Sequence, residues 1–75
     1  MPKLPIIKDK QLIKVLKKLG FVKHRQRGTS HLIMVHSDGR RTVISIHSGK
    51  DIPRGTLKAI LRDIEITNNN FIDLL

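Results

Sequence analysis

Four histidines are the residues of this 75-residue chain best suited to chemistry near neutral pH: His24, His31, His36 and His47. An imidazole has an unperturbed pKa near ~6.5 and can therefore take or give a proton under those conditions. The chain has no cysteine, which excludes a thiol nucleophile, a thiolate zinc site and a disulfide framework. Because His31 and His36 are an odd number of residues apart on one predicted strand, they lie on opposite faces and cannot share a metal ion without distortion. We expect acid–base chemistry that uses no metal and no other cofactor.

Cleavage of RNA is a reaction that one placed histidine can support. RNA supplies its own nucleophile, the 2′-hydroxyl. A base must remove the proton of that hydroxyl, and cations must stabilise the negative charge that develops on the phosphate. A small basic domain with a positioned histidine meets these needs. The sequence leaves the second proton-transfer group open, with water, His47 and Lys50 as the alternatives.

The local sequence singles out His31 as the catalytic candidate. It ends the run Arg25-Gln26-Arg27-Gly28-Thr29-Ser30-His31, in which two arginines flank a glycine turn. Guanidinium groups bind phosphate bidentately, and a glycine lets the backbone approach a ligand closely. The run therefore predicts RNA contacts from Arg25, Arg27, Gly28 and Ser30. The alternative interpretation is that His31 is a hydrogen-bonded histidine of the core.

The other three histidines have simpler interpretations. We expect His24 to be a surface residue of a basic strand and His36 to be a solvated strand end. His47 ends the third predicted strand, and it either supports the site or contacts RNA. Lys50, which follows it closely, is a candidate phosphate contact.

The charge of the chain is large and unevenly distributed. The chain has 15 Lys and Arg residues and six Asp and Glu residues, for a net charge of +9. Residues 1–50 hold 12 basic and 2 acidic side chains, and residues 51–75 hold 3 basic and 4 acidic ones. Such a field attracts polyanions, with nucleic acid as the first candidate and an anionic membrane surface as the second. Phe21 and Phe71 are the only aromatic residues of the Phe, Tyr and Trp types. They are too few for membrane anchoring or base stacking, so we expect RNA contacts mostly to phosphates, with weak base specificity.

The length predicts one domain over residues 1–75. A chain of this size buries about 60% of the surface that its unfolded form exposes. It is too short to contain a dedicated cofactor-binding fold. No apolar run approaches the ~18–20 residues of a membrane span, and residues 1–7 are too short and proline-broken for a signal peptide. We expect a cytoplasmic protein without a membrane partner.

The first predicted element is an amphipathic helix. Asp9 is a candidate N-cap, Gly20 a candidate C-terminal stop, and the apolar stripe has helical spacing. The stripe consists of Leu12, Val15, Leu16 and Leu19. Four lysines, Lys10, Lys14, Lys17 and Lys18, occupy the other side. They form either a solvated face or an RNA contact.

Three strands are predicted next, over residues 21–26, 30–36 and 41–47, with Asp38-Gly39 as a hairpin turn. If this pair forms the centre of the turn, Ile33 lies opposite Ile44 and His31 opposite Ile46. This more apolar face should pack on the helices. The other face, which carries Leu32, Met34 and Val43, is then an open surface for RNA or a partner protein.

The remainder predicts two further helices. Pro53 suits the first position of a helix whose stripe is Leu57, Ile60, Leu61 and Ile64, and Thr67 is a candidate cap of a short last helix. The resulting fold class is α+β, in the order α-β-β-β-α, with a three-stranded antiparallel sheet covered by helices on one face. The double-stranded-RNA-binding domain has the same order of elements.

Over Gly20 to Thr67, the sequence resembles the HicA toxin family, the small ribonucleases of type II toxin–antitoxin pairs. The matching segments are Leu19-Gly20-Phe21-Val22, the run from Arg25 to His31, Asp38-Gly39-Arg40, Val43 through Lys50, and Ile52-Pro53-Arg54-Gly55-Thr56-Leu57 with Ile60-Leu61 behind it. The Gly-x-Ser-His run is short, but its order and spacing relative to the later segments make the match fairly specific.

The resemblance implies a double-stranded-RNA-binding-domain-like fold and an activity that cleaves messenger RNA and stops translation. It also implies that the histidine of the Gly-Ser-His run, His31 here, is catalytic, and that a HicB-type antitoxin masks the site. One departure is Thr29, which separates Gly28 from Ser30 where many members run Gly-Ser-His directly. A one-residue bulge at this point would absorb the extra residue and turn His31 away from the apolar face.

Three functions remain to be distinguished. The first is an RNA endonuclease toxin in which His31 acts as general acid or base. The second is a non-catalytic RNA-binding module of the same shape. The third is an interaction protein whose half-apolar sheet face meets another chain.

Overall fold

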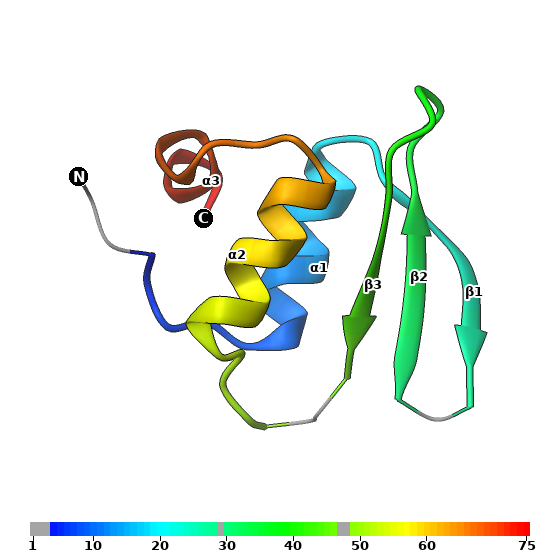
Figure 1. Ribbon diagram of the computed structural model, residues 1–75, viewed down its shortest axis with the longest axis horizontal. Coiled ribbons are helices and arrows are strands. Elements are labelled where there is room, and N and C mark those ends of the chain that lie inside the picture. Colours follow the sequence, from blue (N-terminus) through cyan, green and yellow to red (C-terminus); the bar gives the residue numbers. More distant parts are fainter. Residues whose placement is uncertain (1–3, 29, 47–48) are drawn as a thin grey trace.

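The computed structural model of the chain describes residues 4–28, 30–46 and 49–75. Its elements are α1 (Asp9–Lys18), β1 (Val22–Arg27), β2 (His31–Val35), β3 (Arg41–Ser45), α2 (Arg54–Asp63) and α3 (Asn68–Leu74). The strands form one antiparallel sheet in the order β1-β2-β3, and the helices lie together to one side of it (Figure 1). The predicted α-β-β-β-α order and the α+β class are confirmed, with α3 as the additional short helix.

Helix α1 ends where the glycine signal predicted. Gly20 has a φ of +99°, and the N–H of Phe21 donates to the carbonyl oxygen of Leu16 at 2.9 Å, which is the pattern of a glycine-terminated helix. Its start differs by one residue from the prediction. Lys8 is the N-cap and Asp9 is the first helical residue, because Gln11 Oε1 accepts the backbone N–H of Lys8 at 3.0 Å.

The β2–β3 hairpin has a three-residue loop, not the predicted two-residue turn. The N–H of His36 donates to the carbonyl oxygen of Arg40 at 2.8 Å, so these residues close the loop and Gly39 takes the left-handed conformation within it, with φ +99°. Three-residue hairpin loops commonly place a glycine there. The predicted register is therefore wrong by one residue, and Ile33 pairs with Val43 while Leu32 pairs with Ile44.

This one-residue change exchanges the faces of β2, because successive side chains of a strand point to opposite sides. Leu32 and Met34, predicted to be open, belong to the core, as does Ile44. His31, predicted to lie opposite Ile46 on the apolar face, is exposed and pairs with Ser45. The strand residues that share its face are called the outer sheet face below: Val22, Arg25, His31, Ile33, Val35, Arg41, Val43 and Ser45.

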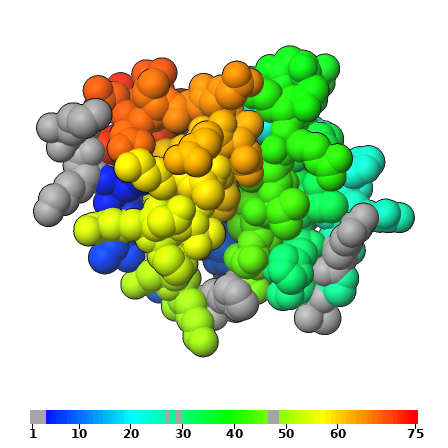
Figure 2. Space-filling model, in the orientation of Figure 1, coloured from blue at the N-terminus to red at the C-terminus, as the bar shows by residue number. Residues whose placement is uncertain are grey.

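The core lies between the inner sheet face and the helices. Its α1 and α2 members are Leu12, Val15, Leu16, Leu57, Ile60 and Leu61. The expected apolar stripes of both helices are thus confirmed, and Figure 2 shows α2 (yellow) covering much of α1 (blue) on the viewed side. Thr42, which is buried on the inner face, donates its hydroxyl to Asp63 Oδ2 at 3.0 Å and ties β3 to the end of α2.

The last two helices begin close to their predicted starts. Pro53 is the N-cap of α2 and not its first helical residue. Thr67 caps α3 as expected, since its side chain accepts the backbone N–H of Asn70 at 3.2 Å. Within the described ranges, none of the helices has the length and apolar character needed to cross a bilayer.

Candidate functional site

His31 begins β2 at one end of the outer sheet face. It pairs with Arg27 of β1 on one side and with Ser45 of β3 on the other, and its side chain is exposed. The interpretation of His31 as a core histidine is therefore wrong. Its outward orientation follows from the hairpin register, and an exposed imidazole is available to an RNA chain lying on the sheet.

Ser30 contacts the ring of His31 directly. Its Oγ lies 3.3 Å from His31 Nδ1. The backbone of Ser30 is held in turn, because its carbonyl oxygen accepts the N–H of Ile46 at 2.6 Å. Ser30 therefore lies opposite Ile46, which the predicted register had placed opposite His31. A hydroxyl at Nδ1 leaves Nε2 as the ring nitrogen free to exchange a proton with a substrate.

Arg25 of β1 comes to the same face as His31 after an irregularity in the strand. The pairing between β1 and β2 shifts between Lys23 and Arg25, so His24 is the extra residue of a bulge. Beyond the bulge, Arg25 pairs with Ile33, two residues along the strand from His31. Long side chains reach such diagonal neighbours. The bulge thus brings a guanidinium, not a histidine, to the face that carries His31.

The remaining residues of the Gly-x-Ser-His run are placed in part. Gly28 has a φ of +60° in the turn between β1 and β2, with nothing within 4 Å of where a Cβ would stand. The backbone of Arg27 pairs with that of His31. Thr29, where a bulge was expected, and His47 lie outside the described residues.

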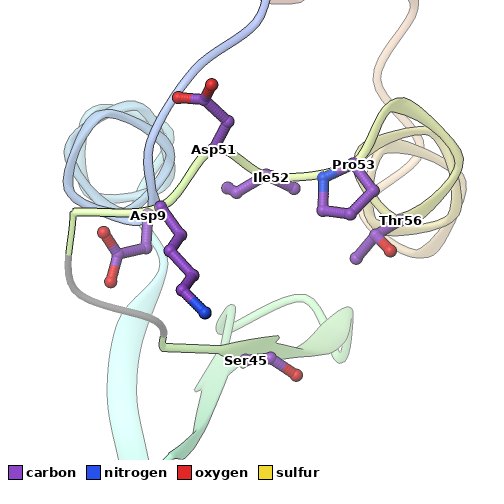
Figure 3. Close-up of a pocket in the computed structure, with 7 residues that line it drawn as sticks. Asp9, Ser45, Asp51, Ile52, Pro53 and Thr56 are labelled. Carbon is purple, nitrogen blue, oxygen red and sulfur yellow. The ribbon is translucent and has the colours of Figure 1, made fainter.

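Lys50 lines a hollow at the same end of the molecule. A pocket of about 170 Å³ lies between the start of α1, the end of β3 and the start of α2 (Figure 3). It is lined by Asp9, Ser45, Lys50, Asp51, Ile52, Pro53 and Thr56. Ser45, which lines the hollow, is also the cross-strand partner of His31.

His36 is a structural residue and not the solvated strand end that the sequence predicted. Its Nε2 donates to the carbonyl oxygen of Leu19 at 3.1 Å, and its ring meets that of Phe21 edge-on at 5.1 Å. Five residues of extended strand place it roughly 16 Å from His31. His24 is exposed, as expected. Within the described ranges, no three His, Asp or Glu side chains gather closely enough to hold a metal ion.

Ser45 is a candidate site residue that sequence reasoning missed, because the predicted register placed Ile46, and not Ser45, opposite His31. The signal that would have found it is the glycine of Asp38-Gly39. If Gly39 is taken as the left-handed last residue of a three-residue loop, His31 falls opposite Ser45. The hollow had no signal in the sequence, since its lining comes from three separate segments.

Comparison with known proteins bears on this arrangement. The family model described as the HicA toxin of bacterial toxin–antitoxin systems matches residues 10–66, which span the whole sheet, α2 and most of α1. A search of curated proteins found no significant match. The family match covers more than half of the chain and includes the run that ends at His31. The chain therefore belongs to the HicA toxin family of bacterial toxin–antitoxin systems.

Proposed function

We propose that this toxin is an endoribonuclease that cleaves messenger RNA by acid–base catalysis at His31 and so blocks translation. The observation that carries the proposal is the position of His31, which is exposed at the end of the outer sheet face with Ser30 at its Nδ1. The family match supports the toxin assignment.

The reaction follows from the groups on this face. The 2′-oxygen of one nucleotide attacks the adjacent phosphorus as its proton leaves, and the bond from phosphorus to the 5′-oxygen of the next nucleotide breaks as that oxygen gains a proton. His31 performs one of these proton transfers. Arg25, together with Arg27, binds the phosphate and stabilises its developing charge, and no metal ion is required for these steps.

A matched pair of histidine variants tests the proposal. His31→Ala should lower the rate of RNA cleavage by about 10²–10⁴-fold and abolish growth arrest, because a general acid or base contributes that much. His24→Ala removes an exposed histidine at the bulge of β1 and should leave both unchanged. Cleavage of a labelled transcript by the purified proteins, with and without EDTA, is the measurement, and circular dichroism checks folding.

Each contrary result points to a different conclusion. A folded His31→Ala protein that still cleaves RNA removes the histidine from the mechanism. Loss of wild-type activity in EDTA contradicts metal-free catalysis. Wild-type protein that binds RNA but leaves it intact after long incubation is the non-catalytic module instead.

A HicB-type antitoxin is the protein partner that we propose. The outer sheet face mixes basic residues such as Arg25 and Arg41 with exposed apolar ones such as Val22 and Val43, so an acidic partner with apolar contacts fits it. Co-expression of a small acidic protein from the adjacent reading frame should restore growth. Unchanged growth arrest, with both proteins expressed, contradicts this partner.

A further inference from the structure

The hollow beside Ser45 lies at the same end of the molecule as His31. The start of β2, the end of β3 and the first turns of α1 and α2 are all found at this end (Figure 1). Ser45 lines the hollow and is the cross-strand partner of His31, but the hollow lies on the side of the helices and His31 is exposed on the outer sheet face. An RNA chain that passes from His31 around the end of β3 would therefore reach this hollow.

The walls of the hollow are mainly carbon. Ile52 and Pro53 line it from the segment before α2, and Thr56 lines it from the first turn of that helix. The carboxylates of Asp9 and Asp51 point away from its middle (Figure 3). They are also engaged elsewhere: Asp9 Oδ1 accepts the backbone N–H of Lys10 at 2.9 Å, and Asp51 Oδ1 lies 3.2 Å from Lys8 Nζ.

One positive charge borders this apolar space. Lys50 lines the hollow and is exposed, and the ion pairs among residues 4–28, 30–46 and 49–75 do not include it. Its ammonium is thus available to a phosphate at the rim, while the apolar walls offer nothing to an anion. Apart from its phosphates, the large group of an RNA chain that fits such a wall is the base, through its flat face.

The hollow is held in shape by contacts with the segment before α1. The N–H of Ile52 donates to the carbonyl oxygen of Ile7 at 2.8 Å, and Lys8 Nζ donates to the carbonyl oxygen of Gly49 at 2.9 Å. These bonds fix residues 49–52 against the start of α1, so the site does not have to be formed by the ligand. Its volume of about 170 Å³ is below the ~300–1,000 Å³ of pockets that take drug-sized molecules, which suits one ring system.

We propose that this hollow binds the base of a nucleotide adjacent to the scissile phosphate, with Ile52, Pro53 and Thr56 against the base and Lys50 on the phosphate. The inference rests on the proposed ribonuclease function for its substrate class. It also revises the expectation from composition, because a chain without Trp or Tyr can still hold an unstacked base against aliphatic walls.

Binding of nucleoside monophosphates tests this without any cleavage step. The probes are the four nucleoside 3′-monophosphates, with ribose 5-phosphate as the ligand that lacks a base, titrated into the wild-type protein and followed by amide chemical shifts. The nucleotides should shift the amides of Ser45, Ile52 and Thr56, and at least one should bind roughly fivefold or more tightly than ribose 5-phosphate, because packing a base contributes that much.

Two methionine variants of α2 provide the matched control. Thr56→Met places a longer side chain into the hollow and should abolish the advantage of nucleotides over ribose 5-phosphate. Ala59→Met changes an exposed residue of the same helix that does not line the hollow, and should keep that advantage. Equal affinity for nucleotides and ribose 5-phosphate, or an unchanged advantage in Thr56→Met, overturns the inference. Because these ligands contain no bond for the enzyme to cleave, base binding here without RNA cleavage would overturn the proposed function alone.

Discussion

At the scale of single residues, the site depends on how the His31 ring is held. A catalytic imidazole must present one ring nitrogen to the substrate, and a hydrogen-bond partner at the other nitrogen orients the ring. Ser30 is that partner here, with Oγ 3.3 Å from Nδ1, and its backbone is fixed by the bond to Ile46. We therefore regard Ser30 as a positioning residue for His31.

Removing this hydroxyl should affect turnover more than binding. We expect Ser30→Ala to lower kcat about fivefold, the equivalent of a hydrogen bond of about 1 kcal/mol, and to change the pH profile of kcat while KM stays close to the wild-type value. Ser37→Ala, at an exposed position of the hairpin loop, is the control. The measurement is steady-state cleavage of a fluorogenic RNA across pH. A rise in KM with an unaltered pH profile would mean that Ser30 only contacts RNA.

At the scale of elements, the β2–β3 loop joins the ends of α1 and α2. His36 donates to the carbonyl oxygen of Leu19, and Arg40 Nη1 donates to that of Ile64 at 2.6 Å. The Arg40 guanidinium also lies 5.2 Å from the centre of the Phe21 ring. The same loop sets the register of β2 and β3. These contacts therefore help to determine which residues of the two strands lie opposite each other at the site, at the far end of the sheet.

Two glycine variants separate backbone strain from helix propensity. Gly20→Ala forces an alanine into φ +99° and places its Cβ 3.0 Å from His36 Nε2, so we expect a loss of about 2 kcal/mol of stability. Gly55→Ala lies in the first turn of α2, where the glycine has no close neighbour, and should stabilise by up to about 1 kcal/mol. Urea unfolding measures both. Equal effects of the two substitutions would contradict a special role for Gly20.

The same loop contains a carboxylate whose ionisation stabilises the fold. The hydrogen bond from the backbone N–H of Arg40 lowers the pKa of Asp38 below its ordinary value; desolvation opposes this effect, and the Arg40 guanidinium and His36 add to it. A pKa that is lower in the folded than in the unfolded chain means that the ionised form stabilises folding. This contribution is present above the unfolded-state pKa and is lost as the pH falls through the folded-state pKa.

Asp38→Asn should therefore have a lower urea midpoint than wild type at pH 7, and the difference should shrink progressively as the pH falls below 3.8, the ordinary value of an aspartate. Asp73→Asn, at an exposed position of α3 outside the loop, serves as the control. A gap between wild type and Asp38→Asn that stays constant over this pH range would show that the carboxylate charge is not what stabilises the loop.

At the scale of the whole molecule, the basic residues are divided between two sides. Arg25 and Arg41 are exposed on the outer sheet face with His31, whereas Lys10, Lys14, Lys17 and Lys18 are exposed on α1, which packs against the inner face through its apolar stripe. In the proposed reaction, RNA bound for cleavage at His31 would lie on the outer side. The structure therefore favours a solvated role for the lysines of α1.

This division predicts different salt dependences for two charge-removing variants. In the His31→Ala background, Arg25→Ala should reduce the slope of log affinity against log salt for single-stranded RNA by about 0.7, because one phosphate contact is lost. Lys14→Ala should leave the slope unchanged. Fluorescence anisotropy over a range of salt concentrations measures both. A slope that falls in Lys14→Ala and not in Arg25→Ala would place the RNA on the helical side.

The sequence by itself determined the elements of this protein, since their signals are local. The apolar stripes, Gly20, Asp38-Gly39 and Thr67 predict the helices, the hairpin and the last cap, and the run ending at His31 predicts the candidate catalytic residue. Such signals depend on residues that are only a few positions apart in the chain, so they can be read directly from the sequence.

Only the tertiary structure decided which way His31 faces and what lies beside it. The Asp38-Gly39 signal is compatible with loops of two or three residues, and this choice exchanges the faces of β2 relative to β3. Packing settles it, because Leu32, Met34 and Ile44 together fill the space under the helices. The hollow, likewise, exists only where α1, β3 and α2 meet, and no local pattern encodes the meeting of segments so far apart in the chain.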